Sequence, residues 1–239
     1  MSSAPQGLMD TMVLTDLTGP MVLMGVLGLV IGSFLNVVVR RWPLIMERRW
    51  WSEASQQMQD EDSLRRAWGT ALATEVPASA PASAPTSAPP AAPSSLSTHA
   101  KALHQGLMAQ PELSLSRPAS HCPACGHTLK WHELIPVLSW LMLKGRCSAC
   151  GAPIGVRYPF VELATAALFM AMAWRWGPDP LALLWSAWGA TLLALALIDW
   201  DTLLLPDDLT LPLVWAGLAA AALGWTISPK EAIAGAVWG

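Results

Sequence analysis

The sequence predicts an all-α polytopic membrane protein with a small cytosolic zinc-ribbon-like insertion. Three observations lead to this prediction. The chain of 239 residues is 53% hydrophobic and only 13% charged, whereas an ordinary soluble domain is about 25% charged. Its apolar residues gather in runs of the length that a helix needs to cross a membrane. Its four cysteines form two closely spaced pairs, with none left over.

Uncharged apolar runs locate the predicted transmembrane helices. A helix of about 20 apolar residues spans the hydrocarbon core of a bilayer, which is roughly 30 Å thick. Residues 17–39 contain no charged side chain and are predicted to be the first span. Further spans are predicted near 158–176, 180–198 and 209–229. Residues 232–239 resemble the opening of another span, so the chain is expected to be truncated at its C-terminus.

Basic residues set the predicted orientation of these spans. Of the 14 lysines and arginines, 12 lie between Arg40 and Arg157. Positive charge beside membrane spans marks the cytoplasmic side. Residues 40–157 are therefore predicted to form a cytosolic loop, and residues 1–16 an external tail. The net charge of −3 argues against a nucleic-acid partner. The apolar composition makes membrane lipid the expected environment.

The cytosolic loop divides into two parts. Residues 76–98 are almost entirely alanine, proline and serine, and are predicted to be a disordered spacer because they have too little apolar bulk to form a core. Residues 119–157 hold the cysteines and an uncharged stretch from Leu134 to Leu143. That stretch is expected to rest on the membrane surface, to cover a metal site, or to do both.

The cysteine spacing predicts a metal site in this second part. Cys122-Pro-Ala-Cys125 and Cys147-Ser-Ala-Cys150 are each followed by glycine, and 21 residues separate the two pairs. Such pairs bring four thiolates to one tetrahedral zinc ion, and the glycine relieves the tight turn after each pair. Two structural disulfides are the alternative, which an oxidising compartment would favour and the cytosol does not. A closed site of four thiolates leaves no position for water, so the predicted zinc is structural.

An acidic cluster follows the predicted span 180–198. Asp199, Asp201, Asp207 and Asp208 lie within ten residues that contain no lysine or arginine. The simplest interpretation is a solvated cytosolic turn in which Pro206 breaks the helix. Asp199, however, directly follows an apolar run, and an ionisable group at such a boundary is costly and is therefore a functional candidate. Two carboxyl groups that share a proton can activate water, one of them acting as the base.

Several stretches, taken in order, resemble one family of enzymes. They are residues 32–43 (GSFLNVVVRRWP), the two CxxCG motifs with IPVLSW between them, residues 157–159 (RYP) followed by Glu162, residues 197–201 (LIDWD) and residues 205–212 (LPDDLTLP). Together they closely resemble the bacterial type IV prepilin peptidases, also called leader peptidase/N-methyltransferases. The resemblance covers residues 20–50 and 119–239.

The resemblance implies a multi-pass aspartic endopeptidase of the bacterial inner membrane. Such enzymes remove the leader peptide from type IV prepilins and type II secretion pseudopilins on the cytosolic side. They then methylate the new N-terminus with S-adenosylmethionine. The resemblance makes Asp199 the first catalytic aspartate and places residues 158–239 in the peptidase membrane region. It assigns the second aspartate to a Gly-x-Gly-Asp motif that this sequence does not contain, so the chain alone is expected to be inactive.

Two hypotheses from other classes compete with this one. The chain could be a non-catalytic membrane scaffold whose zinc module binds a cytosolic partner. It could also be a transporter that uses Asp199 and Asp201 in an ion path. Transporters commonly show internal repeats, and none is evident in this sequence. The scaffold is therefore the main alternative.

Overall fold

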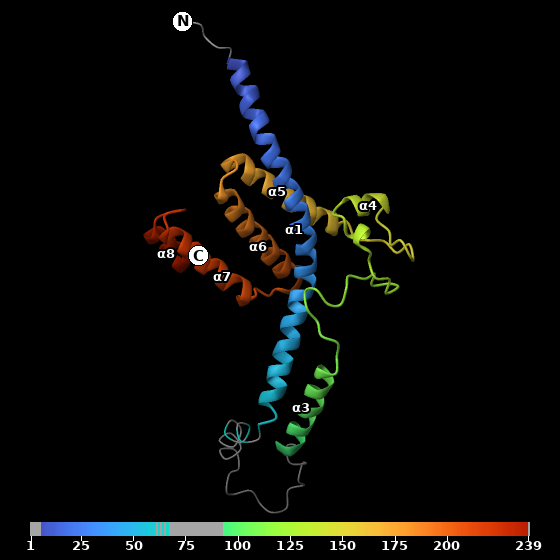
Figure 1. The fold of residues 1–239 in the computed structure, drawn as a ribbon. Coiled ribbons are helices and arrows are strands. Elements are labelled where there is room, and N and C mark those ends of the chain that lie inside the picture. Colours follow the sequence, from blue (N-terminus) through green and yellow to red (C-terminus); the bar gives the residue numbers. More distant parts are fainter. Residues whose placement is uncertain (1–5, 61, 63, 65, 67–92, 239) are drawn as a thin grey trace, which may run out of the picture. The chain divides into compact units, whose positions relative to one another are not determined.

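The computed structural model describes residues 6–60, 62, 64, 66 and 93–238 (Figure 1). Within these residues every regular element is a helix. The helices are α1 (Gln6–Gln57), α3 (Pro93–Met108), the short 3-10 helix η1 (Trp131–Leu134), α4 (Leu138–Met142), α5 (Arg157–Trp176), α6 (Pro180–Thr202), α7 (Asp207–Ala222) and α8 (Pro229–Trp238). The predicted all-α class is therefore confirmed for the described residues. Two helical segments, Thr18–Gln57 and Pro180–Thr202, are long and apolar enough to cross a membrane.

Some helix boundaries differ from the predicted ones. Residues 17–39 lie inside α1, which continues past Arg40 to Gln57, so the segment after residue 39 begins as helix rather than as loop. The predicted run 209–229 is not one helix, because α7 ends at Ala222 and α8 begins at Pro229. Gly224 adopts a positive φ of 74°, and the next N–H, of Trp225, bonds back to the carbonyl of Ala220 at 2.9 Å. A glycine in this conformation ends a helix, which the uncharged composition of the run does not reveal.

The predicted spacer, residues 76–98, is only partly described. Residues 76–92 lie outside the described residues. Residues 93–98, which the sequence analysis places at the end of the spacer, belong to α3 in the structure. Pro93 stands at the first position of α3. A proline is well tolerated there, since its missing N–H would have had no partner within the helix.

The chain folds into two compact units, residues 44–114 and residues 1–43 with 115–239. In the unit 44–114, Arg48 donates from Nη1 to the carbonyl of Pro111 at 2.9 Å. The buried hydroxyl of Ser55 lies 3.1 Å from Nδ1 of His104. Buried Ala100 adds to this packing between α3 and the last turns of α1.

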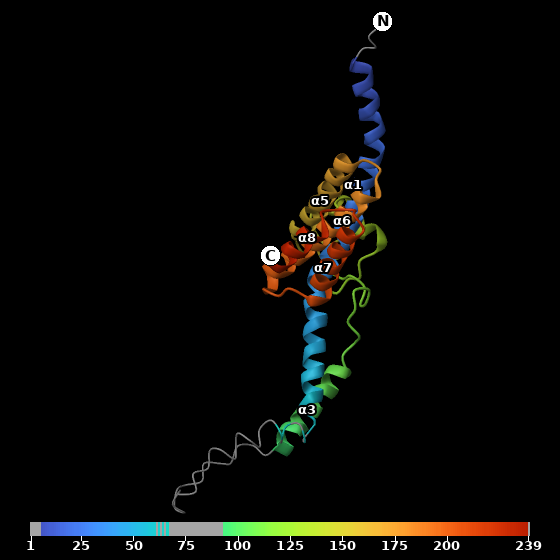
Figure 2. The ribbon, with the colours of Figure 1, turned by 90° about the vertical axis from the view of Figure 1, so that its left-hand side faces the viewer.

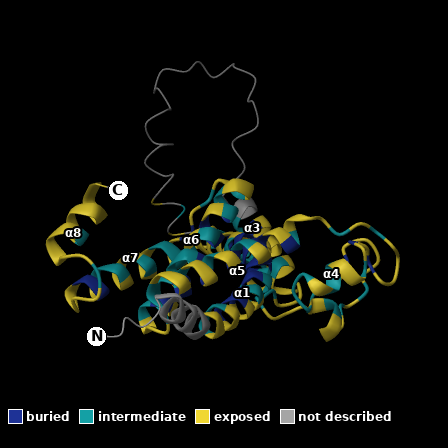
Figure 3. Cartoon of the chain, turned by 90° about the horizontal axis from the view of Figure 1, so that it is seen from above, coloured by how far each residue is buried: buried dark blue, intermediate teal, exposed yellow. Residues whose placement is uncertain are grey.

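In the other unit, α5 pairs with α6 and crosses α1 (Figures 1 and 2). Figure 3 shows the buried residues where these helices meet, whereas α8 and the segment around α4 are mostly exposed. The core consists of Met24, Leu35, Val39, Val161, Phe169, Ala173, Ala182, Ala190, Ala194 and Ile198. This packing positions the first turn of α5 and the last turn of α6, where the candidate site lies.

Glycines allow α1 to approach α5 closely. A Cβ added to Gly28 would lie 2.6 Å from the Cα of Ala166, and one added to Gly32 would lie 2.7 Å from the Cα of Glu162. No side chain fits at such distances, so the two backbones can meet only where α1 has glycine. Small residues four apart serve this purpose between membrane helices.

Replacing Gly28 by valine is therefore expected to destabilise the protein by about 1–3 kcal/mol, the usual cost of overpacking. Gly19→Val is the matched control, because a Cβ at Gly19 meets nothing within 4 Å on the same helix. Thermal unfolding of the detergent-solubilised protein measures both variants. Equal losses of stability would mean that helix propensity, and not the contact with α5, explains the effect.

Candidate functional site

The first cysteine pair lies in a tight turn closed by backbone hydrogen bonds. The N–H of Cys122 donates to the carbonyl of His127 at 2.9 Å, and the N–H of Gly126 donates back to the carbonyl of Cys122 at 2.9 Å. Gly126 has a φ of 71°, a conformation that glycine adopts without steric cost. An isolated antiparallel bridge between His121 and Thr128 closes the base of the turn.

The second cysteine pair repeats this geometry. The N–H of Cys147 donates to the carbonyl of Ala152 at 2.8 Å, and that of Gly151 to the carbonyl of Cys147 at 2.9 Å. Gly151 has a φ of 73°. Arg146 and Pro153 form the corresponding bridge. The glycine after each CxxC pair therefore has the role that the sequence predicts for it.

The two turns bring all four predicted cysteines together. Their Sγ atoms lie within 4.8 Å of one another. Cys122 and Cys147 are buried, while Cys125 and Cys150 are exposed. The Sγ atoms of Cys122 and Cys150 are 3.9 Å apart, far beyond the S–S bond length of about 2.0 Å, and all four cysteines are free thiols. The cluster can hold a metal ion, and its donor set of four sulfur atoms is the one that tetrahedral zinc prefers.

Backbone N–H groups lower the pKa of two of these thiols and so favour the thiolate form that binds a cation. The N–H groups of Ala124 and Cys125 lower the pKa of the Cys122 thiol to about 7. The N–H groups of Cys150 and Ala149 likewise lower the pKa of Cys147. The backbone N–H of His127 also lowers the pKa of Cys125, but the Cys150 thiol, desolvation and the thiols of Cys122 and Cys147 together raise it to about 12. Four thiolates so close together repel one another, and a bound divalent cation removes that repulsion.

Glu133, which the sequence analysis did not single out, connects the two turns. Its Oε2 accepts the N–H of Lys130 at 2.7 Å and lies 3.3 Å from Nε2 of His127, both of which follow the first cysteine pair. Its Oε1 accepts the hydroxyl of Ser148, which lies between the cysteines of the second pair. The Lys130 N–H, followed by the Ser148 hydroxyl, lowers the pKa of Glu133 to about 2. The Glu133 side chain is only 4% exposed, so its carboxylate is held in place as a fixed cross-link.

Replacing Glu133 by alanine is expected to weaken zinc binding by roughly tenfold, because the charged hydrogen bonds that hold the two turns in register are lost. Competition with a chromophoric chelator measures the apparent zinc affinity. Glu112→Ala is the control, since Glu112 is an exposed glutamate outside the cysteine module. An unchanged affinity in Glu133→Ala would show that the cysteine turns hold their register without it.

The acidic cluster is spread over two helices. Asp199 is half-buried in the last turn of α6, and its carbonyl accepts the N–H of Leu203 at 2.8 Å where the helix ends. Asp207 and Asp208 are exposed in the first turn of α7, where the helix dipole favours negative charge. Buried Pro206 separates the two helices, as its role of helix breaker predicts.

Asp201 has a basic partner that is remote in sequence. Arg157, the first residue of α5, donates from Nη1 to Oδ1 of Asp201 at 2.8 Å, and its Nη2 lies 2.7 Å from Oδ2. The two side chains thus form a bidentate pair, which is the most geometrically specific contact between arginine and a carboxylate. This pair neutralises Asp201 and leaves Asp199 as the carboxylate at the apolar boundary. The local sequence, which has no basic residue near Asp201, gives no sign of the pair.

The chain matches known families along most of its length. Residues 26–176 match the family model described as the bacterial peptidase A24 N-terminal domain. Residues 186–239 match the type IV leader peptidase family. The first match includes all four cysteines, and the second includes Asp199. No solved structure matches the chain.

Curated relatives share more than a third of the aligned residues. The chain is 38% identical over 214 residues to a prepilin leader peptidase/N-methyltransferase of Burkholderia pseudomallei (strain K96243), an alignment that covers 90% of the chain and 56% of the relative. It is 39% identical over 218 residues to the protein of the same name in Pseudomonas aeruginosa, which covers 89% of the chain and 58% of the relative. A third relative of that name, from Dichelobacter nodosus, is 38% identical over 218 residues, covering 90% of the chain and 61% of the relative. The chain thus spans a little over half the length of these relatives.

Proposed function

The chain belongs to the bacterial type IV leader peptidase family, and we propose that it acts as an aspartic endopeptidase on type IV prepilins and type II secretion pseudopilins. In this proposal the enzyme removes the leader peptide and then methylates the new N-terminus. The observation that carries the proposal is the match of both the cysteine module and the turn that bears Asp199 to this family. The names of the relatives describe enzymes. They therefore do not favour the alternative hypothesis that the chain is a non-catalytic membrane scaffold.

Asp199 is the proposed general base for leader cleavage. Its carboxylate would take a proton from a water molecule whose oxygen attacks the carbonyl carbon of the scissile peptide bond. A second carboxyl group must donate a proton to the departing amine, and the family resemblance assigns it to a Gly-x-Gly-Asp motif. S-adenosylmethionine, the proposed cofactor of the second reaction, supplies a methyl group bound to a sulfonium, which the freed amine can attack.

Arg157 and Asp201 are proposed to position Asp199. Asp201 follows Asp199 by two residues in the last turn of α6, and its bidentate contact with Arg157 ties that turn to the start of α5. The contact also neutralises one negative charge beside the proposed base. A carboxylate held on a tethered helix end is better placed to activate water than one on a fraying end.

The four cysteines are proposed to hold one structural zinc ion. Support comes from the four Sγ atoms within 4.8 Å of one another and from the lowered pKa values of Cys122 and Cys147. Residues 119–157, which we call the zinc module, are proposed to depend on this ion for their fold.

The chain is proposed to cross the bacterial inner membrane several times, with residues 1–16 outside and the zinc module in the cytosol. Large apolar side chains face outward along the helices, such as Val22 (65% exposed) on α1, Leu163 (53%) on α5 and Leu192 (56%) on α6. Apolar surface of this extent needs a lipid or protein partner. At the α5–α6 turn, Trp176 stacks on Trp185 with ring centres 5.7 Å apart. Tryptophans gather at membrane–water interfaces, and this turn is separated from Asp199 by the length of α6.

Reporter fusions test this topology. Fusions after residues 60, 177 and 204 are expected to read inside, outside and inside, because 12 of the 14 basic residues lie between Arg40 and Arg157. An alkaline phosphatase and a cytosolic fluorescent reporter at each site give opposite signals, so each serves as the control for the other. Any other pattern would overturn the proposed topology.

A cleavage assay tests the proposed function. A protein that contains this chain and has the full length of its relatives is purified in detergent and incubated with a type IV prepilin and S-adenosylmethionine. Gel mobility reports loss of the leader, and mass spectrometry of the N-terminal peptide reports methylation. A folded, zinc-loaded protein that neither cleaves nor methylates the prepilin would contradict the proposal and favour the scaffold hypothesis.

A further inference from the structure

The zinc module exposes an apolar surface for which the described structure offers no protein cover. This surface belongs to the uncharged stretch Leu134 to Leu143, which includes α4. Leu134, Leu138, Leu141 and Met142 are all exposed, Met142 to 74%. Exposed lysines, Lys130 and Lys144, stand on either side of the stretch. The stretch is therefore an apolar segment with a cationic side chain on either side of it.

Hydrogen bonds fix the depth of this stretch relative to α1. The N–H of Val137 donates to Oε2 of Glu162 at 2.7 Å, and the Cα of Glu162 lies 2.7 Å from the point where a Cβ of Gly32 would stand. The start of α4 is thus level with Gly32. Gly32 precedes Arg40, the first charged residue after the apolar run of α1, by eight residues, which is about 12 Å along a helix.

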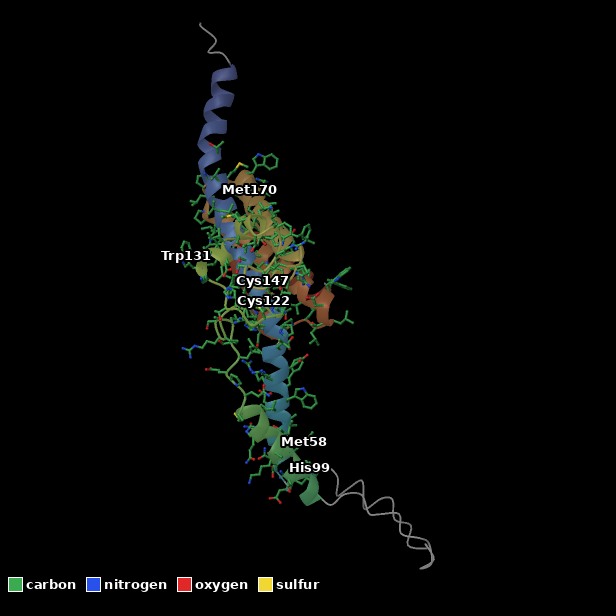
Figure 4. The ribbon with its side chains drawn as sticks, turned by 90° about the vertical axis from the view of Figure 1, so that its right-hand side faces the viewer. Met58, His99, Cys122, Trp131, Cys147 and Met170 are labelled. Carbon is green, nitrogen blue, oxygen red and sulfur yellow. The ribbon has the colours of Figure 1, made fainter. Side chains whose placement is uncertain are left out.

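The contacts of Tyr158 mark where the charged end of α1 lies. Asn36 donates from Nδ2 to the carbonyl of Tyr158 at 3.1 Å, and Arg40 donates to its hydroxyl. The start of α5 is therefore level with the last turn of the apolar run, and Glu162 lies one turn deeper. Figure 4 shows the same order of depths. Along the direction of α1, Trp131 lies between Met170, which is on α5, and the labelled cysteines. The stretch that follows Trp131 consequently lies at the depth of apolar helix surface and not beyond it.

The backbone of the stretch is suited to an apolar medium, where every N–H must find a partner within the protein. Val137, which has a φ of 58°, is the residue that precedes α4, and Glu162 accepts its N–H. The N–H of Ser139 donates to the carbonyl of Ile135 at 3.1 Å. The indole N–H of Trp140 donates to the carbonyl of Ile154 at 3.1 Å. Polar groups thus turn inward while the leucines and Met142 face outward.

We propose that residues 134–143 form a re-entrant segment that enters the bilayer from the cytosolic side and contacts lipid acyl chains. Lys130 and Lys144 extend to the headgroups at its two ends, and Glu162, which accepts the N–H of Val137, holds the segment at its depth. The inference rests on the proposed membrane insertion of α1 and α5. It goes further than the two roles expected from the sequence, because the segment lies within the hydrocarbon instead of on its surface.

Photo-crosslinking tests where the segment lies. The photoreactive residue benzoylphenylalanine is placed at position 142, 22 or 149 of the full chain, which is reconstituted into vesicles of phosphatidylethanolamine and phosphatidylglycerol. Position 22, on the apolar face of α1, is the positive control. Position 149, exposed between two cysteines, is the negative control. After illumination, mass spectrometry is expected to find lipid adducts at 142 in a yield close to that at 22 and several-fold above that at 149.

The three positions distinguish the possible failures. Adducts at 22 but not at 142 would overturn the re-entrant segment and leave membrane insertion standing. Adducts at neither position would overturn membrane insertion and this inference together. Equal yields at 142 and 149 would show that residues 134–143 lie no deeper than the cysteine turns and would also overturn the inference.

Two substitutions test the role of Glu162. In Glu162→Leu, amide hydrogen exchange of residues 134–143 is expected to become about tenfold faster, because the N–H of Val137 loses its carboxyl acceptor. In Glu162→Gln, the amide oxygen still accepts this N–H, and exchange is expected to stay near the wild-type rate. Unchanged exchange in Glu162→Leu would show that Glu162 does not hold the segment.

Discussion

Replacing Cys122 by serine is expected to abolish zinc binding and to unfold the zinc module. Cys122 is a buried ligand candidate, and its thiol has the pKa of about 7 that favours thiolate formation. A serine hydroxyl stays protonated and cannot replace a thiolate at zinc. Structural zinc contributes on the order of 10 kcal/mol to the folding of small zinc domains, so its loss exceeds what the few apolar contacts of the module can offset.

Metal analysis and limited proteolysis check this expectation together. The wild-type chain should carry one zinc per molecule and resist cleavage between residues 119 and 157, whereas Cys122→Ser should carry far less zinc and be cut there. Ala124→Ser is the matched control, because it introduces the same hydroxyl at an exposed position of the same turn. Well under one zinc in the wild-type chain, or full zinc in Cys122→Ser, would refute the proposed site.

Replacing Asp199 by asparagine is expected to reduce leader cleavage to background in a protein with the full length of its relatives. An amide cannot accept the proton that a carboxylate takes from attacking water, and loss of a general base costs roughly 10²–10⁴-fold in rate. The fold and the zinc content should not change, since Asp199 is only half-buried at the end of α6 and belongs neither to the core cluster nor to the cysteine cluster.

Two neighbouring aspartates provide graded controls. Asp201→Asn is expected to slow cleavage less than Asp199→Asn, because the asparagine loses the ion pair with Arg157 while the proposed base remains. Asp207→Asn, at an exposed position in the first turn of α7, is expected to cleave at nearly the wild-type rate. Prepilin cleavage followed by gel decides the order. Wild-type cleavage by Asp199→Asn would remove the central assignment, and complete loss in Asp207→Asn would transfer it to α7.

The Arg157–Asp201 ion pair connects the zinc module to the helix that carries the proposed catalytic base, Asp199. Arg157 is the last residue of the zinc module and the first of α5, while Asp201 lies two residues after the proposed base. Within this unit, the fold of the module and the position of the α6 end are therefore mechanically connected.

The sequence alone determined the features that depend on composition and short-range spacing. The long apolar runs predicted α1, α5 and α6, since a helix in lipid satisfies its own backbone groups within one segment. The CxxCG spacing predicted that four thiols meet, because each pair and its glycine form a local turn whose geometry needs no distant residue. The motifs around Cys122 and Asp199 were also sufficient to indicate the family.

Only the tertiary structure decided which residues meet across long stretches of chain. Arg157 reaches Asp201, Glu133 connects the two cysteine turns, and Glu162 accepts the N–H of Val137. The break between α7 and α8 likewise depends on the conformation of Gly224, which an uncharged run does not reveal. Such contacts depend on how the helices pack, and packing is set by side-chain shape at crossings such as that of Gly32 with Glu162. No periodicity or local spacing encodes these partners, so a single sequence leaves them undetermined.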